Sequence, residues 1–214
     1  ATAAGWVKPE SMRNAFIAVF VLTAIIGSYL IFRAGWPIVI VGAASIFFAI
    51  IYTAGPFPLG YNGLGDIFVL IFFGPVAVGG TYFVQALEIN STVILAGIAP
   101  GLFSTAILTV NNLRDINQDV QSGKKTLQVR LGKRFGQQEY LWSILIACLL
   151  PAVLVIKTGG HYFSLISCPA FFLALPSLKI IFKEKPSKKY NAVLAQTGKM
   201  LLIFSLLFSI GWVI

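Results

Sequence analysis

Residues 90–119 read NSTVILAGIAPGLFSTAILTVNNLRDINQD, an apolar run of membrane-spanning length that ends in a polar motif. The motif places Asp115 and Asp119 four residues apart, so on a helical continuation both carboxylates lie on one face. Carboxylate oxygens are ligands that Mg²⁺ prefers, and the motif therefore predicts a magnesium site that holds a substrate phosphate. A second interpretation is a solvated helix end whose acids pair only with Lys124 and Lys125.

The composition is that of an integral membrane protein. Hydrophobic residues make up 57% of the 214 residues and charged residues only 11%, whereas about a quarter of the residues are charged in soluble domains. The net charge of +9 has to lie in the loops, against anionic lipid headgroups or an anionic substrate. Nucleic-acid binding is a poor explanation of that charge in a chain this apolar, so we expect no nucleic-acid partner.

The apolar runs predict an all-α fold, a multi-pass transmembrane bundle of about seven helices. The expected spans are 14–32, 35–53, 65–87, 90–112, 138–157, 161–182 and 193–213. Three longer connections join them, at 54–64, 113–137 and 183–192. The pair Pro100-Gly101 lies inside one span and is expected to kink it.

The basic residues indicate the orientation. If the N-terminus is cytoplasmic, nearly all Lys and Arg residues fall on the cytoplasmic side, and the opposite side holds only Arg33 and Lys157. The positive-inside rule therefore places the three long connections in the cytoplasm. We expect the active-site loops there, in a multi-pass protein of the inner (plasma) membrane.

The connection at 113–137 combines the two acids with a group of cations. These are Lys124, Lys125, Arg130, Lys133 and Arg134. A metal-bound diphosphate needs such cations, because Lys and Arg neutralise the phosphate oxygens that Mg²⁺ leaves uncovered. A basic cytoplasmic loop that simply follows from topology is the competing explanation.

Several motifs together resemble the UbiA superfamily of intramembrane prenyltransferases. The segment 111–132, NNLRDINQDVQSGKKTLQVRLG, is similar to the second aspartate-rich motif of that family. The segments 55–66, 72–75 and 82–85 resemble the loop and helix that precede it, and 196–199 resembles the start of the last span. More narrowly, the resemblance is to the branch that prenylates 1,4-dihydroxy-2-naphthoate.

The resemblance implies a nine-helix fold, of which about seven helices are expected here as a single transmembrane prenyltransferase domain over 1–214. The family carries a first Asp-rich motif ahead of the helix that begins near Asn14, where this chain offers only Glu10. We therefore expect the domain to be incomplete at its N-terminus. We also expect these residues alone to be inactive, because two Mg²⁺ ions beside a diphosphate usually take several carboxylates.

The activity implied by the resemblance is Mg²⁺-dependent transfer of a polyprenyl group from polyprenyl diphosphate to 1,4-dihydroxy-2-naphthoate, within membrane lipid. Diphosphate and CO₂ leave, and the product is demethylmenaquinone, an intermediate of menaquinone biosynthesis. One alternative keeps the fold and changes a substrate: the acceptor would be 4-hydroxybenzoate, homogentisate or a chlorin, or the donor a phytyl group for phylloquinone. The other alternative is a non-catalytic membrane transporter or lipid-binding protein.

The resemblance also implies roles for individual residues. The expected catalytic residues are Asp115, Asp119, Arg114 and Lys124, and the expected metal ligands are Asp115, Asp119 and Asn111. The expected substrate-binding residues are Asn111, Asn112, Lys125, Arg130, Tyr61, Asp66, Gln196 and Lys199. Three alternatives remain: a capping role for Asn111, an N-cap role for Asp66 before a helix at Ile67, and snorkelling of Lys199 to the interface.

Overall fold

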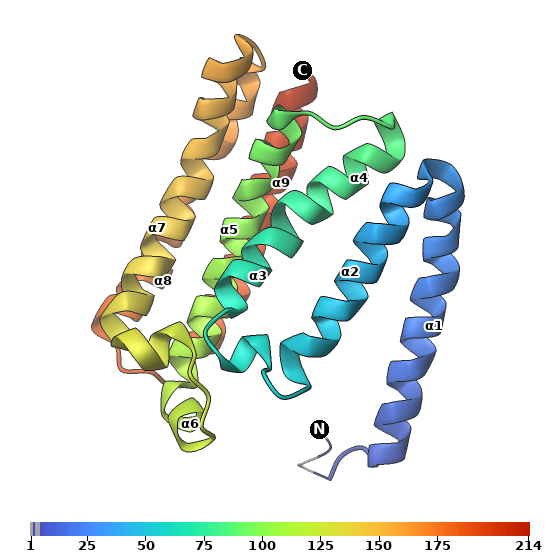
Figure 1. Cartoon of the computed structure of the whole chain (residues 1–214). Helices are drawn as coiled ribbons and strands as arrows, with labels where there is room; N and C mark the ends of the chain where they lie inside the picture. The colour runs from blue at the N-terminus through green and yellow to red at the C-terminus, as the bar shows by residue number, and fades with distance from the viewer. Residues whose placement is uncertain (1, 3–4) are drawn as a thin grey trace.

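The computed structural model describes residues 2 and 5–214 and is built from helices (Figure 1). The elements are α1 (Pro9–Ala34), α2 (Trp36–Thr53), η1 (Leu59–Tyr61), α3 (Gly65–Ile71), η2 (Phe72–Val76), α4 (Ala77–Ala86), α5 (Ser91–Arg114), α6 (Ile116–Gln121), α7 (Leu127–Thr158), η3 (Tyr162–Ala174), α8 (Leu175–Lys183) and α9 (Tyr190–Val213). The described residues contain no β-strand. The expected all-α fold is confirmed.

In the described part of the chain, seven helical segments are long and apolar enough to cross a membrane. Five of them are the single helices α1, α2, α5, α7 and α9. In the other two, short segments follow one another: α3, η2 and α4 form one span, and η3 and α8 form another. The chain is therefore a multi-pass membrane protein, with spans close to those expected from hydropathy.

Helix α7 begins earlier than expected. The side chain of Thr126 caps it by accepting a hydrogen bond from the backbone N–H of Val129 at 3.4 Å. The helical geometry is then interrupted at Gly132, whose φ of 84° lies in the region that favours glycine. The expected loop at 113–137 is thus largely helical, because α6 and the polar start of α7 occupy it. Polar helices of this kind leave no signal in hydropathy.

The core lies where α5, α7, η3 and α9 meet. Phe103 and Val110 of α5, Tyr140 of α7 and Phe204 of α9 are buried there. The hydroxyl oxygens of Tyr140 and Thr197 lie 2.9 Å apart and form a hydrogen bond between α7 and α9. Buried polar groups are usually paired in this way, so the bond fixes the two helices that carry the polar loops against each other.

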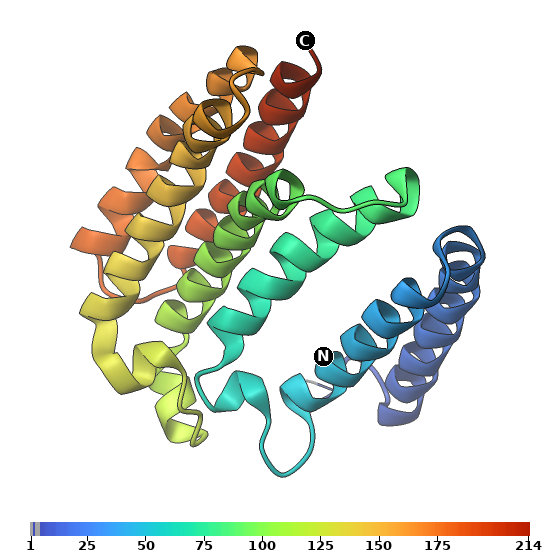
Figure 2. The same cartoon turned by 45° about the horizontal axis from the view of Figure 1, so that its top comes forward.

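Helices α1 and α2 form a hairpin at the edge of the bundle (Figures 1 and 2). None of their residues is buried. Lipid accepts apolar side chains as readily as a protein core does, so an exposed apolar hairpin is stable in a membrane. Phe48 of α2 meets the bundle through Phe68 and Phe72, whose ring centroids lie 4.9 and 5.5 Å away.

The span formed by α3, η2 and α4 bends at Gly74, where φ is −111° and ψ is −109°. The bend lies against two glycines of α5. A Cβ atom on Gly97 would lie 3.0 Å from Cα of Pro75, and one on Gly101 would lie 2.5 Å from the carbonyl oxygen of Leu70. Only glycine permits backbones to approach this closely.

Helix α5 continues through Pro100 as one helix. The hydroxyl of Ser104 donates to the carbonyl oxygen of Pro100 at 2.8 Å. The expected kink at Pro100-Gly101 stays a prediction. The neighbouring span does depart from helical geometry, at Gly74, and Gly101 lies at the contact between the two spans.

Candidate active site

The three long connections lie at the same end of the bundle as the start of α1, and the C-terminus lies at the opposite end (Figure 1). Hydrogen bonds join these connections to their neighbours. The backbone N–H of Lys125 donates to the carbonyl oxygen of Tyr61 at 2.7 Å, and Nζ of Lys133 donates to the carbonyl oxygen of Glu184 at 2.9 Å. The expected gathering of the polar loops at one end is confirmed. Their cytoplasmic location stays a prediction.

Asp119 lies on the short helix α6, and Asp115 lies immediately before it. Asp115 stands at the junction where α5 ends and α6 begins, with φ of −98° and ψ of 8°. The backbone N–H of Asp119 donates to the carbonyl oxygen of Asp115 at 2.8 Å, which keeps the helical spacing across the junction. The side chain of Asp119 is 6% exposed and that of Asp115 is 27% exposed. Two carboxylates one helical turn apart therefore lie at the boundary of the bundle.

The guanidinium of Arg114 connects the acidic motif to helix α9. Its Nε and Nη2 donate to the two carboxylate oxygens of Asp115 at 2.7 and 2.6 Å. Nη2 also donates to Oδ1 of Asn111 at 2.7 Å, and Nη1 donates to Oδ1 of Asn191 at 2.8 Å. Sequence reasoning missed Asn191, whose only signal is its place in the third long connection. Bidentate pairs fix both partners in orientation, so α9 helps to position Asp115 through Arg114.

Lys124 forms an ion pair with Asp119, the second acid of the motif. Its Nζ lies 3.1 Å from Oδ1 of Asp119 and 5.0 Å from the ring centroid of Tyr61. A cation over an aromatic face is attracted by the ring quadrupole. The structure thus brings together three of the expected residues, Tyr61, Asp119 and Lys124, from two connections that are far apart in the sequence.

The same two connections meet at Arg130. Its Nη2 donates to the carbonyl oxygen of Asn62 at 3.0 Å. The adjacent Gly63 has φ of 77°, and a Cβ atom there would lie 3.0 Å from the carbonyl oxygen of Lys125. A side chain at this position would push the loops apart. Arg130 and Lys125 therefore join the expected cluster, and both are exposed.

Four other predicted residues lie apart from these contacts. Asn112 is buried on α5, and Asp66 is buried in the first turn of α3. Because α3 begins at Gly65, the alternative of Asp66 as an N-cap is wrong. The amide of Gln196 donates to the carbonyl oxygen of Leu173 at 3.3 Å. Lys199 is exposed on α9. The roles of these four residues in binding a substrate stay predictions.

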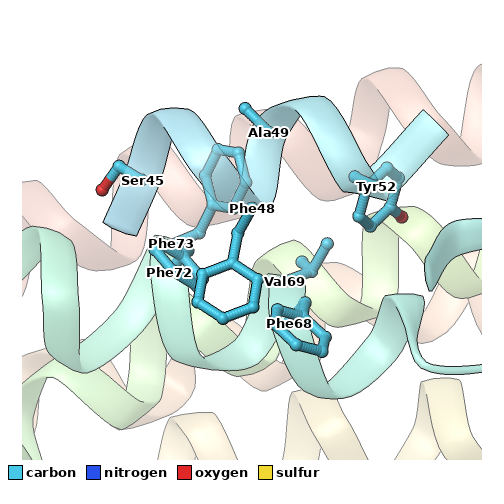
Figure 3. Close-up of a pocket in the computed structure, with 8 residues that line it drawn as sticks. All are labelled: Ser45, Phe48, Ala49, Tyr52, Phe68, Val69, Phe72 and Phe73. Atoms are coloured by element: carbon cyan, nitrogen blue, oxygen red, sulfur yellow. The ribbon is translucent and has the colours of Figure 1, made fainter. Parts of the chain in front are cut away.

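An apolar cavity of about 530 Å³ opens between α2 and the segment formed by α3 and η2. Figure 3 shows Phe48, Phe68 and Phe72 along it, with Tyr52 at one end. The hydroxyl of Tyr52 lies against Gly65, at the start of α3. The cavity therefore extends from the apolar interior to the polar loop that precedes α3.

The polar cluster fits a divalent metal in its chemistry. Asp115, Asp119 and Asn111 offer only oxygen ligands, which suit hard cations. Each already faces a cation, Arg114 or Lys124, that a bound phosphate would attract. Within the residues described, no three Asp, Glu, His or Cys side chains gather as a complete metal centre. The role of this cluster in binding a metal and a diphosphate stays a prediction.

The model of the UbiA prenyltransferase family matches residues 1–212. The chain belongs to that family. This UbiA-family chain is 42% identical to the 1,4-dihydroxy-2-naphthoate octaprenyltransferase of Haemophilus influenzae, over 81% of its own length and 56% of the relative. Proteins of the same name from Escherichia coli and Mycobacterium tuberculosis are 38% and 35% identical, over 97% and 92% of this chain and 69% and 67% of their own lengths. No solved structure matches the chain.

Proposed function

We propose that the protein transfers a polyprenyl group from polyprenyl diphosphate to 1,4-dihydroxy-2-naphthoate and so makes demethylmenaquinol, the reduced form of demethylmenaquinone. One observation carries the proposal: the pairs Asp115–Arg114 and Asp119–Lys124 lie together at the boundary of an apolar bundle. Such a cluster can hold a charged diphosphate while the attached chain stays in an apolar phase. The printed names of the relatives supply the naphthoate acceptor.

The donor binds through its diphosphate. Asp115, Asp119 and Asn111 would hold Mg²⁺, which neutralises charge on the diphosphate as the carbon–oxygen bond breaks. Arg114 and Lys124 leave their carboxylates for phosphate oxygens, because charge-assisted bonds to phosphate are strong. Lys125 and Arg130, which are exposed beside them, neutralise the remaining charge.

The apolar cavity receives the isoprenoid. Its lining of Phe48, Phe68 and Phe72 is apolar. With the isoprenoid bound, such a lining would keep water away from an allylic cation and protect it from hydrolysis. The electron-rich ring of the acceptor forms the new carbon–carbon bond at the carbon that bears the carboxylate. That carboxylate then leaves as CO₂, and its bonding electrons restore the aromatic ring.

The acceptor is proposed to bind between the two connections, with Tyr61 and Asp66 as polar contacts. Tyr61 stands beside Lys124, and Asp66 begins the helix that lines the cavity. Gln196 and Lys199 remain proposed substrate contacts from the other side, on α9. The excess of Lys and Arg at this end of the bundle supports a cytoplasmic site in the plasma membrane.

The test uses the full-length protein in membrane vesicles with polyprenyl diphosphate and Mg²⁺. It compares 1,4-dihydroxy-2-naphthoate, 4-hydroxybenzoate and homogentisate as acceptors, and mass spectrometry identifies the products. We expect a prenylated naphthoquinol that lacks the carboxylate. Prenylation of either other acceptor instead, or flux across the vesicle without a covalent product, would contradict the proposal.

A further inference from the structure

A second polar cluster lies where α5 packs against α3 and α7, and it shares no residue with the Asp115–Asp119 motif. Its members are Asp66 of α3, Thr109 of α5, and Gln128 and Glu139 of α7. Asp66 is 5% exposed, and Thr109 and Gln128 are fully buried. Helix α5 packs against both α3 and α7, and so brings these residues together. A polar cluster at this position is costly unless its groups are satisfied.

Glu139 and Gln128 form the centre of this cluster. Oε2 of Glu139 accepts hydrogen bonds from the hydroxyl of Thr109 at 3.0 Å and from Nε2 of Gln128 at 2.5 Å. Asp66 joins this cluster from α3, which packs against α5. The hydroxyl of Thr105, one turn before Thr109 on α5, donates to the backbone carbonyl oxygen of Asp66 at 3.4 Å.

The cluster has more acceptors than donors. Oδ1 of Asp66 and Oε1 of Gln128 are buried and have no hydrogen-bond partner. Within the described residues, neither Asp66 nor Glu139 forms an ion pair with a Lys, Arg or His. A carboxylate and an amide carbonyl can only accept, so nothing inside this cluster satisfies these oxygens.

We propose that Asp66, Gln128 and Glu139 bind a hard divalent cation at a site separate from the one at Asp115 and Asp119. A shared proton would neutralise only one carboxyl and would leave the carbonyl oxygen of Gln128 unpartnered. A divalent ion balances both carboxylates and takes that oxygen as a neutral ligand. The ion links the start of α3 to α7 beneath the two connections that form the candidate active site.

The test measures Mn²⁺ binding by electron paramagnetic resonance, without any diphosphate. In the full-length protein carrying Asp115→Asn and Asp119→Asn, adding Asp66→Asn and Glu139→Gln should remove one bound Mn²⁺ per chain, whatever other acidic motifs of that protein still bind. Adding Glu184→Gln, at an exposed acid that pairs with Lys189, should remove none. An Mn²⁺ stoichiometry that Asp66→Asn and Glu139→Gln leave unchanged would overturn the proposal.

Thermal unfolding supplies a second readout that does not depend on stoichiometry. Asp66→Asn and Glu139→Gln remove charge repulsion and keep side-chain shape, so the metal-free variant should unfold at the same or a higher temperature than its parent. Mn²⁺ should raise the unfolding temperature of the parent by more than it raises that of the variant. Equal stabilisation of both proteins by Mn²⁺ would refute the site.

Discussion

Arg114 forms a bidentate ion pair with Asp115, with nitrogen–oxygen distances of 2.7 and 2.6 Å. The cation that precedes the acid in the sequence therefore covers both oxygens of a predicted metal ligand. The same guanidinium reaches Asn191 on α9. In the proposed mechanism, a diphosphate would offer Arg114 new acceptors and Asp115 would then be free to hold the metal. Until substrate binds, the ion pair would keep both side chains in place.

The contact to α9 predicts the effect of Asn191→Ala. Loss of the acceptor for Nη1 leaves Arg114 less well oriented toward phosphate. Because Asn191 is exposed, we expect a loss of about 1 kcal/mol, or roughly fivefold in KM for the diphosphate donor, with kcat little changed. Steady-state kinetics of the full-length protein measure this change in KM. Asn117→Ala, at an exposed Asn of α6, is the control, and an equal rise in KM there would contradict the explanation.

The placement of Lys124 over the ring of Tyr61 predicts a difference between two substitutions. Tyr61→Ala removes the aromatic face and should raise KM for the donor about two- to fivefold, since such contacts contribute about 0.5–1 kcal/mol at exposed sites. Tyr61→Phe keeps the face and should leave KM for the donor unchanged. If Tyr61→Phe instead raises KM for the naphthoate, the hydroxyl contacts the acceptor, as proposed. Equal donor effects for Ala and Phe would contradict the role of the ring.

The close approach of α3 and η2 to α5 predicts that Gly101→Ala destabilises the protein. The added Cβ atom would lie 2.5 Å from the carbonyl oxygen of Leu70, and overpacking of this kind costs about 1–3 kcal/mol. Gly80→Ala is the control, because its Cβ atom would meet open space and alanine favours the helix by up to about 1 kcal/mol. Thermal unfolding in detergent compares the two. A Gly101→Ala protein as stable as Gly80→Ala would show that the packing is looser than described.

Much of the fold could be predicted because each span carries its own apolar signal. For most helices, the ends expected from hydropathy lie within a few residues of the observed ends, because the thickness of the lipid bilayer sets the length of a span. Helix α7 was the exception: its first turns are polar, and only the cap at Thr126 marks their start. The bend at Gly74 could not be predicted from the sequence either. Gly74 lies against Gly97 and Gly101 of α5, and this contact between two spans exists only in the folded structure.

The candidate site was predictable in its acids and cations, which lie together in the sequence. Its partners from elsewhere were not. Asn191 and Tyr61 reach Arg114 and Lys124 only through the packing of α9 and the docking of the loops. Glu139 could have been predicted as a functional candidate, because a carboxylate inside an expected apolar span usually has a partner or a function.

The central claim is that Asp115 and Asp119 hold the metal that releases diphosphate. Its most direct measurement is the rate of prenyl transfer to 1,4-dihydroxy-2-naphthoate, as a function of Mg²⁺, by full-length protein carrying Asp115→Asn or Asp119→Asn. Each substitution should reduce the rate about a hundredfold or more, because a catalytic metal supplies several kcal/mol, while membrane insertion stays intact. A double variant that keeps a Mg²⁺-dependent rate within about threefold of the parent would contradict the account.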